Sequence, residues 1–376
     1  MQYDNNFLGR NGFIWFNGVV EDRNDPQKVG RLRVRCLGYH TENKSELPTA
    51  DLPWASCVLP VTSSGISGLG GHPFIVEGSW VFGYFRDGND CQEPVILGTL
   101  PGKPIEYGKP SGGFYDPNAR ETPNEDKSVY PREINETDIN RLAVNDVNLV
   151  AASLASRRLA RRITMATADF DATSGADGST IAASDGTTWN QPVIPYEAVY
   201  PYNHVYESES GHVLEFDDSF IIDENGDRVN HYRVHMRHTS GTSFEWHNNG
   251  DHTALNKGDH YNITTGKWQQ QIDGNRELTV NGHYKLRING DGETDNHYDI
   301  QVGPNANINI QVDTGKINLI TKQGDINVNS GGNYNVKVGG NYTMSVAGSR
   351  AITVNGTTND VTQGAVQHRG CTIDLN

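Results

Sequence analysis

The stretch from Gly332 to Asn355 reads GNYNVKVG, GNYTMSVA and GSRAITVN, which is three successive octads that each begin with glycine. The spacing continues on both sides as two ladders, Gly250, Gly258, Gly266, Gly274, Gly282 and Gly290, then Gly324, Gly332, Gly340, Gly348, Gly356 and Gly364. Inside the octads the apolar side chains alternate with polar ones, as Tyr334, Val336 and Val338 do. Period-two alternation predicts short strands with one apolar face, and the glycines provide the positive φ that sharp turns need.

The length of the repeat restricts the architecture that it can build. About six extended residues at ~3.3 Å each span roughly 20 Å, which is one wall of a prism and cannot enclose a core. Three chains that each supply one wall per layer would enclose it, so we expect an intertwined homotrimeric β-helix, or β-prism. An antiparallel meander with a turn at each Asn-Gly pair is the alternative. The predicted trimer core is Ile272, Val280, Ile288, Val336, Val338, Val346 and Val354.

The composition of the whole chain agrees with an all-β fold. The 376 residues include 41 Gly, with 35% hydrophobic and 20% charged residues, which is typical of a polar, turn-rich protein. The formal net charge of -15 argues against nucleic acid as a partner. No apolar run is long enough for a membrane span, and the first residues lack the pattern of a signal peptide.

The N-terminal hundred residues predict a small barrel of the OB type. Five short apolar runs are separated by turn clusters: 13–20, 30–37, 54–61, 79–85 and 95–100. Arg31, Arg33 and Arg35 alternate with apolar residues along the second run, which predicts a basic strand face. Such a face favours electrostatic contact with an acidic protein, whereas an exposed solvated face is the alternative. Binding of nucleic acid would also need exposed aromatic residues interleaved with this charge, and these are not evident in the sequence.

The middle of the chain reads as a linker. Residues 103–133 are rich in Pro, Gly and charge, and the apolar spacing from Thr137 to about Thr167 predicts one helix. Its basic end, Arg157, Arg158, Arg161 and Arg162, is favoured at a helix C-terminus as a solvated group. The alternatives are a patch for an acidic partner, or for nucleic acid or peptidoglycan.

Histidines, acids and cysteines are the side chains that could carry chemistry in this sequence. The histidines around His231, His235 and His238 would make a metal ion on a three-fold axis reasonable, but polar strand positions explain them better. The acids Asp217 and Asp218 point to opposite faces of a strand, and we expect them and Glu207 and Glu209 to be surface or turn residues. The four cysteines show no metal or disulfide spacing, so no cofactor is implied.

Several segments carry a resemblance to a known family. They are the residues VVEDRNDP at 19–26, GRLRVR at 30–35, LPW at 52–54, PVTSS at 60–64, GLGG at 68–71, VILGT at 95–99, YPYNH at 200–204 and ESESGHVLEFDD at 207–218. Together with the octads they resemble the central baseplate spike of T-even-type contractile phages, and the related type VI secretion spikes share the plan. The resemblance implies an OB domain at 1–102, a linker at 103–199 and a triple-stranded β-helix at 200–376.

The same resemblance implies a function and a set of partners. A homotrimer of this kind sits on a baseplate hub, carries a PAAR-type tip protein on its C-terminal end and pierces the host cell envelope, within a virion tail assembled in the host cytoplasm. Arg31, Arg33 and Arg35 would then face the hub, and Val366, Ile373 and Leu375 would form the tip platform. The lysozyme domain of the T-even relative has no counterpart among the 97 residues between the two blocks, so no enzymatic activity is expected. A spike that delivers effectors for a secretion system, or an envelope-degrading enzyme, is the alternative.

Overall fold

The computed structural model describes residues 12–109, 111–119, 121–122, 134–145, 180–182, 186–190, 196–289, 298–367 and 369–370. The chain divides into two compact units, Met1–Lys285 and Leu286–Asn376. Strands dominate the first unit, and the described helices are two single 3-10 turns, Thr49–Asp51 and Gly88–Asp90. No helix in the described part has the length and hydropathy needed to cross a bilayer.

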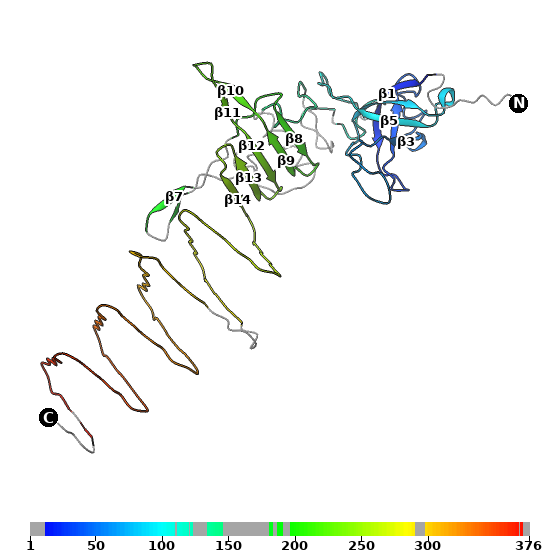
Figure 1. Cartoon of the computed structure of the whole chain (residues 1–376). Coiled ribbons are helices and arrows are strands. Elements are labelled where there is room, and N and C mark those ends of the chain that lie inside the picture. The colour runs from blue at the N-terminus through cyan, green and yellow to red at the C-terminus, as the bar shows by residue number, and fades with distance from the viewer. Residues whose placement is uncertain are drawn as a thin grey trace. The chain divides into compact units, whose positions relative to one another are not determined.

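The N-terminal part of the first unit is a closed five-stranded barrel (Figure 1). Its strands are β1 (Ile14–Asp22), β2 (Leu32–Cys36), β3 (Trp54–Cys57), β4 (Trp80–Phe85) and β5 (Pro94–Thr99). They follow the order β1-β2-β3-β5-β4, with β3 and β5 parallel and β4 closing the barrel against β1. All five expected apolar runs are therefore strands, and the predicted OB-type barrel is confirmed.

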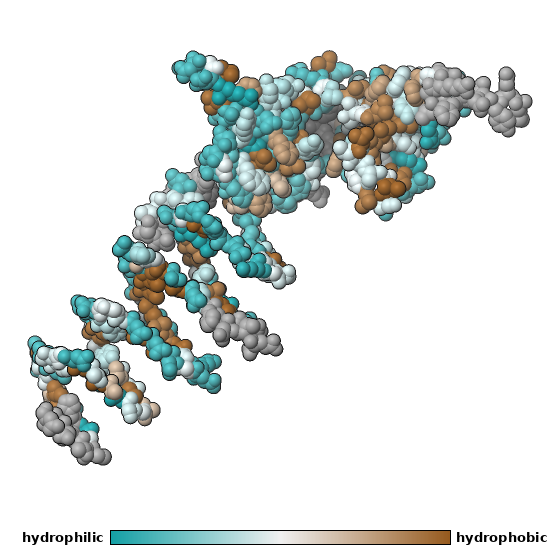
Figure 2. Space-filling model, viewed as in Figure 1, coloured by the Kyte–Doolittle hydropathy of each residue, from teal (hydrophilic) through white to brown (hydrophobic). Residues whose placement is uncertain are grey.

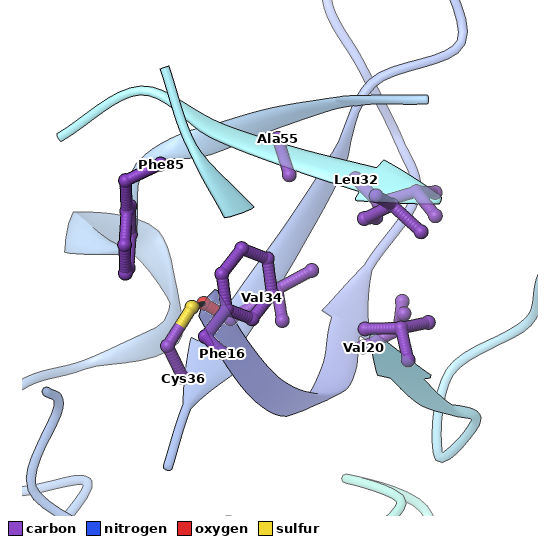
Figure 3. Close-up of a cluster of buried hydrophobic side chains, with 9 residues drawn as sticks. Phe16, Val20, Leu32, Val34, Cys36, Ala55 and Phe85 are labelled. Atoms are coloured by element: carbon purple, nitrogen blue, oxygen red, sulfur yellow. Dashed lines mark hydrogen bonds between the residues drawn. The ribbon is translucent and has the colours of Figure 1, made fainter. Parts of the chain in front are cut away.

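The barrel has a core of its own. Phe16 and Val20 from β1, Val34 and Cys36 from β2 and Phe85 from β4 are buried together and converge inside the barrel (Figure 3). Inward and outward residues alternate along β4, which keeps Val81 and Phe85 inside and Phe82 and Tyr84 on the outer surface. Because these inward positions are filled, the barrel needs no partner to close its core.

A second sheet follows at residues 203–255. Five antiparallel strands lie in the order β14-β13-β12-β9-β8, and their bounds are β8 Asn203–Glu207, β9 Val213–Asp217, β12 Arg233–Arg237, β13 Ser243–His247 and β14 His252–Leu255. Two small hairpins accompany it, β10 (Phe220–Ile222) with β11 (Arg228–Asn230), and β6 (Thr180–Ala182) with β7 (Thr188–Asn190). At Gly250, the first glycine of the ladders, the chain forms the antiparallel hairpin that was the alternative to a β-helix. Gly250 turns the chain between β13 and β14 with φ +88°.

From residue 256 onward the described chain has no strand and runs as extended stretches between sharp bends (Figure 1). Bends fall at 257–258, 265–266, 273–274 and 281–282, and again at 331–332, 339–340, 347–348, 355–356 and 363–364. Each bend ends on a glycine of one of the two ladders. The octad is therefore the structural repeat of this segment, as its sequence predicts.

The predicted helix at 137–167 is wrong for the residues that the structure describes. Residues 141–145 form turns, in which the Val144 N–H donates to the carbonyl oxygen of Asn140 at 3.2 Å. Asn145 then adopts a left-handed φ of +53°, which ends any helical continuation at that point. Residues 146–167 lie outside the described residues, and so do the four arginines at 157, 158, 161 and 162.

Candidate functional site

The three arginines of the predicted basic face have different surroundings. The Arg31 guanidinium pairs with the Asp25 carboxylate at 2.7 Å, and this hydrogen bond holds the pKa of Asp25 well below its usual range. Arg33 donates to the carbonyl oxygens of Thr49 and Ala50 and lies over the Trp54 ring, 4.6 Å from the centroid. Both side chains keep some exposure, so their predicted contact with a hub remains a prediction.

Arg35 does not fit that prediction because its side chain is fully buried. Its Nε donates to Glu21 Oε1 at 2.6 Å, Nη1 donates to the Thr41 carbonyl oxygen at 2.6 Å, and Nη2 donates to the Leu47 carbonyl oxygen at 2.7 Å. Alternation along β2 places Arg35 opposite Val34, as expected, but the 41–51 loop covers that side of the strand. Arg35 therefore ties this loop to the barrel and is unavailable to a partner.

The barrel also carries an exposed aromatic patch that sequence reasoning missed. It consists of Phe13 and Trp15 at the start of β1, Phe82 and Tyr84 on β4, and Leu97 on β5. The Trp15 ring stacks on Phe82 with centroids 5.2 Å apart, and Phe13 contacts Tyr84 edge-on at 4.9 Å. Phe13, Trp15 and Leu97 are 40%, 46% and 42% exposed. Figure 2 shows apolar side chains gathered on the barrel surface.

The signal for this patch was present in the alternation of strands β1 and β4. Trp15 pairs with Tyr84 and Asn17 with Phe82, so outward residues of the two strands are neighbours. None of the five patch residues is charged. The patch therefore fits an apolar protein surface, in contrast to the acidic one expected for the arginines.

In the second sheet the polar face is covered and the apolar face is open. Glu215, His235 and Glu245 are directly opposite one another across β9, β12 and β13, and all three are buried. The other face presents Leu214, Phe216, Met236, Phe244 and Trp246, which are between 36% and 48% exposed. A soluble sheet normally covers its apolar face, so this arrangement indicates that a further surface packs there.

The predicted surface acids are distributed over both faces. Asp217 and Asp218 do point to opposite sides, but Asp217 is buried and only Asp218 is exposed, so the prediction is wrong for Asp217. Burial raises the pKa of Asp217, although hydrogen bonds from Ser219 oppose that rise. Glu207 accepts a hydrogen bond from Asn140 at 2.8 Å, and Glu209 pairs with Arg23 at 2.8 Å.

The histidines do not assemble a metal centre in the described part of the chain, where no group of three His, Cys, Asp or Glu is suited to hold an ion. His231 Nδ1 lies 2.6 Å from Glu197, and His235 Nδ1 lies 3.1 Å from Glu215. His238 contacts Ser240 through its ring nitrogen. Their partners are thus found in loops and strands of the same sheet.

The predicted trimer-core residues of the octads are all solvent-exposed in a single chain. Ile272, Val280, Ile288, Val336, Val338, Val346 and Val354 are between 44% and 57% exposed. Figure 2 shows apolar side chains at intervals along this part of the chain. Val366 of the predicted tip platform is also exposed, whereas Ile373 and Leu375 lie outside the described residues.

Comparison with known proteins finds similarity in two separate parts of the chain. Residues 38–183 match the model described as the Gp5 N-terminal OB domain, and residues 332–355 match the Gp5 C-terminal repeat in three copies. The chain is 35% identical over 271 residues to Protein Gp5 of Vibrio phage KVP40, covering 65% of this chain and 58% of that protein. It is 39% identical over 136 residues to the pre-baseplate central spike protein Gp5 of Enterobacteria phage T4, covering 34% of this chain and 22% of that protein.

Proposed function

We propose that this chain, a homologue of the phage Gp5 proteins, is a structural component of a contractile tail baseplate and forms its central spike. The observation that carries the proposal is the presence of two unrelated Gp5 features on one chain. The closed barrel lies where the OB-domain model matches in part, and the three matched repeats begin at Gly332, Gly340 and Gly348 of the octad ladder. The proposal places the protein in the tail of the virion.

The chain spans 58% and 22% of the lengths of the two relatives, so its partners are proposals. We assign the barrel domain to residues 1–102, the linker to 103–199 and the shaft to 200–376. Within the shaft, the antiparallel sheet at 203–255 precedes the octads. The assignment has support from the last barrel strand, β5, which ends at Thr99, and from β8, which begins at Asn203.

The shaft is proposed to be a homotrimer. In a single chain its apolar octad residues are exposed, and the backbone hydrogen bonds of the described residues after 256 include just one outside regular elements, from Ala306 N–H to the Gly303 carbonyl oxygen. Extended backbone needs partners for its N–H and C=O groups, and two further copies would supply them while covering the apolar strip. The open face of the 203–255 sheet supports the same conclusion.

The barrel is proposed to dock on the baseplate hub through the aromatic patch. The patch lies near the first residues of β1, while the opposite end of the barrel, at Arg23, contacts Glu209 of the segment before β9. Because the barrel is closed, a partner cannot add a strand and has to contact side chains. Arg31 and Arg33 would contribute at most the charged rim of such an interface.

Co-purification with the hub protein tests the proposal. We expect the full chain to form a complex with the hub, and Trp15→Ser to weaken it by about 2 kcal/mol or more, as for a buried aromatic anchor. Leu69→Ser is the control, because Leu69 is also exposed but lies in the 62–71 loop, outside the patch. Failure of the wild-type chain to bind the hub would contradict the proposal, and equal weakening by both variants would exclude the aromatic patch as the contact.

The C-terminal end, including Val366, Ile373 and Leu375, is proposed to seat a PAAR-type tip protein that meets the host envelope. In this proposal the protein transmits axial force and has no muralytic activity. A zymogram with peptidoglycan tests that part directly: a cleared band at the mass of this chain would contradict it.

A further inference from the structure

Two segments of the linker lie against the polar face of the 203–255 sheet. We call residues 140–145 and 196–199 the strap. Leu142 is buried against Val213, and its carbonyl oxygen accepts hydrogen bonds from the Tyr196 hydroxyl at 2.7 Å and from Asn203 Nδ2 at 3.2 Å. The Val199 N–H donates to Ser219 Oγ at 2.7 Å. The strap is therefore held to the sheet mainly by polar contacts.

A buried ion cluster lies directly beneath these contacts. Arg233 Nη2 is 2.5 Å from Glu215 Oε2, and Arg233 Nη1 is 3.5 Å from Glu245 Oε1. All three side chains are 2% exposed or less. Arg233 also lies over the Tyr196 ring of the strap, 4.9 Å from its centroid, and Asn203 Nδ2 donates to Glu215 Oε1 at 2.6 Å. The cluster and the strap thus share the same side chains.

The charges in this cluster are unequal. Arg233 contacts Glu215 closely and Glu245 only at longer range, so two carboxylates share one guanidinium. His235 Nδ1 lies 3.1 Å from Glu215 Oε2, but His235 Nε2 has no hydrogen-bond partner among the described residues. A charged imidazole needs partners for both N–H groups, so this arrangement disfavours the charged ring. Among the described residues, Arg233, Glu215 and His247 interact with Glu245. The other described titratable or charged groups on this side of the sheet are Asp217 of β9, His235 and Arg237 of β12 and Tyr196 of the strap.

We propose that Glu245 is a proton-dependent fastener of the strap: the linker is held to the sheet while this carboxyl is protonated and is released as it ionises. When Glu245 is neutral, Arg233 balances Glu215 and the covered face carries little net charge. When Glu245 ionises, two buried carboxylates compete for the Arg233 guanidinium, and burial of the second charge costs free energy. Release of the strap exposes this charge to water and removes that cost.

The pKa shifts agree with this geometry. Burial raises the pKa of Glu245 to about 7, with Arg233 opposing the rise. Burial also raises the pKa of Glu215, but the contacts from His235, Arg233 and Asn203 outweigh it and the net shift is downward. A raised carboxyl pKa stabilises the closed state below its open-state value and loses that stabilisation as pH rises through about 7. Glu215, whose pKa is lowered, contributes stability that is lost as pH falls below its ordinary range. His235, whose pKa is also lowered, disfavours the closed state below its ordinary pKa and partly offsets Glu245 at the lower pH.

Amide hydrogen exchange of the full chain at about pH 5.5 and about pH 8.5, corrected for intrinsic exchange, tests the proposal. We expect protection at residues 140–145 and 196–199 to fall about threefold or more at the higher pH. Protection at Val19 and Val20 in the barrel serves as the internal reference for global unfolding. In Glu245→Gln, which keeps a neutral side chain at every pH, strap protection should no longer fall at the higher pH; it should stay level or rise, because His235, whose pKa is lowered in the closed state, destabilises that state at the lower pH.

Glu224→Gln is the matched control, since Glu224 is exposed in the turn between β10 and β11 and should leave the wild-type pH dependence unchanged. Strap protection that does not fall at the higher pH in the wild-type chain, or a fall that persists in Glu245→Gln, would overturn the proposal. Glu215→Gln removes the close partner of Arg233 and should reduce strap protection at both pH values. Should that variant not fold, the comparison of wild type, Glu245→Gln and Glu224→Gln still decides.

Discussion

At the level of single residues, the most constrained group in the barrel is the Arg35–Glu21 pair. Both side chains are fully buried, and Glu21 also accepts a hydrogen bond from the Thr49 hydroxyl at 2.6 Å. The pair joins β1, β2 and the loop that precedes β3. A buried pair need not stabilise a fold more than apolar residues would, but loss of one partner leaves an uncompensated charge.

We therefore expect Arg35→Ala to lower the free energy of unfolding by about 3–5 kcal/mol. Arg86→Ala is the control, because Arg86 and its partner Glu93 are 55% and 52% exposed and such pairs contribute less than about 1 kcal/mol. Denaturant unfolding of the barrel, followed by Trp fluorescence, gives both values. Equal effects of the two substitutions would show that the Arg35 pair has no special structural role.

The sequence predicted the direction of Arg35 but not its burial. Alternation with Leu32 and Val34 places the arginines on the outer side of β2, and that alternation is what the structure shows. Whether an outer side chain stays exposed depends on which loop folds over it, and the sequence of residues 41–51 contains no local pattern that predicts the covering of Arg35. The same limit applies to Asp217, because the strap lies against its face of the sheet. One part of the strap, at Leu142, is more than 70 residues earlier in the chain, and the other part, at Tyr196, is nearby in sequence.

At the level of elements, strands and repeats were predictable because their signals are local. The five barrel strands follow the expected apolar runs, and the bends at 257–282 and 331–364 end on ladder glycines. The expected helix failed in the described part because Asn140 and Asn145 favour turns: the Asn140 side chain accepts the Leu142 N–H at 2.9 Å, and Asn145 is left-handed. Apolar spacing alone does not weigh these local hydrogen bonds.

The same level provides a test of the octad strip. Val338 is an apolar position of the repeat and Lys337 is its polar neighbour on the opposite side. In a closed trimer, Val338→Asp would bury three carboxylates near one axis and cost more than about 3 kcal/mol per chain. We expect it to abolish the assembled form in native gels, while Lys337→Asp leaves assembly intact. Assembly that tolerates both substitutions would place the strip outside the core.

At the level of the whole molecule, the two parts of the chain differ in where their stability originates. The barrel encloses its own apolar core, whereas the shaft leaves its apolar residues exposed in a single copy. In the proposed homotrimer the shaft would gain its stability from association, so its unfolding should depend on protein concentration and the assembly should carry three times the charge of one chain. The resemblance of the sequence to phage spikes and the matches to Gp5 models agree with this division.

Native mass measured with and without SDS at room temperature tests the central claim most directly. The account predicts one species of about three times 41.4 kDa in buffer that persists in SDS until the sample is heated. A well-folded species of 41.4 kDa in buffer would contradict it, because one chain would then have to cover its own apolar strip.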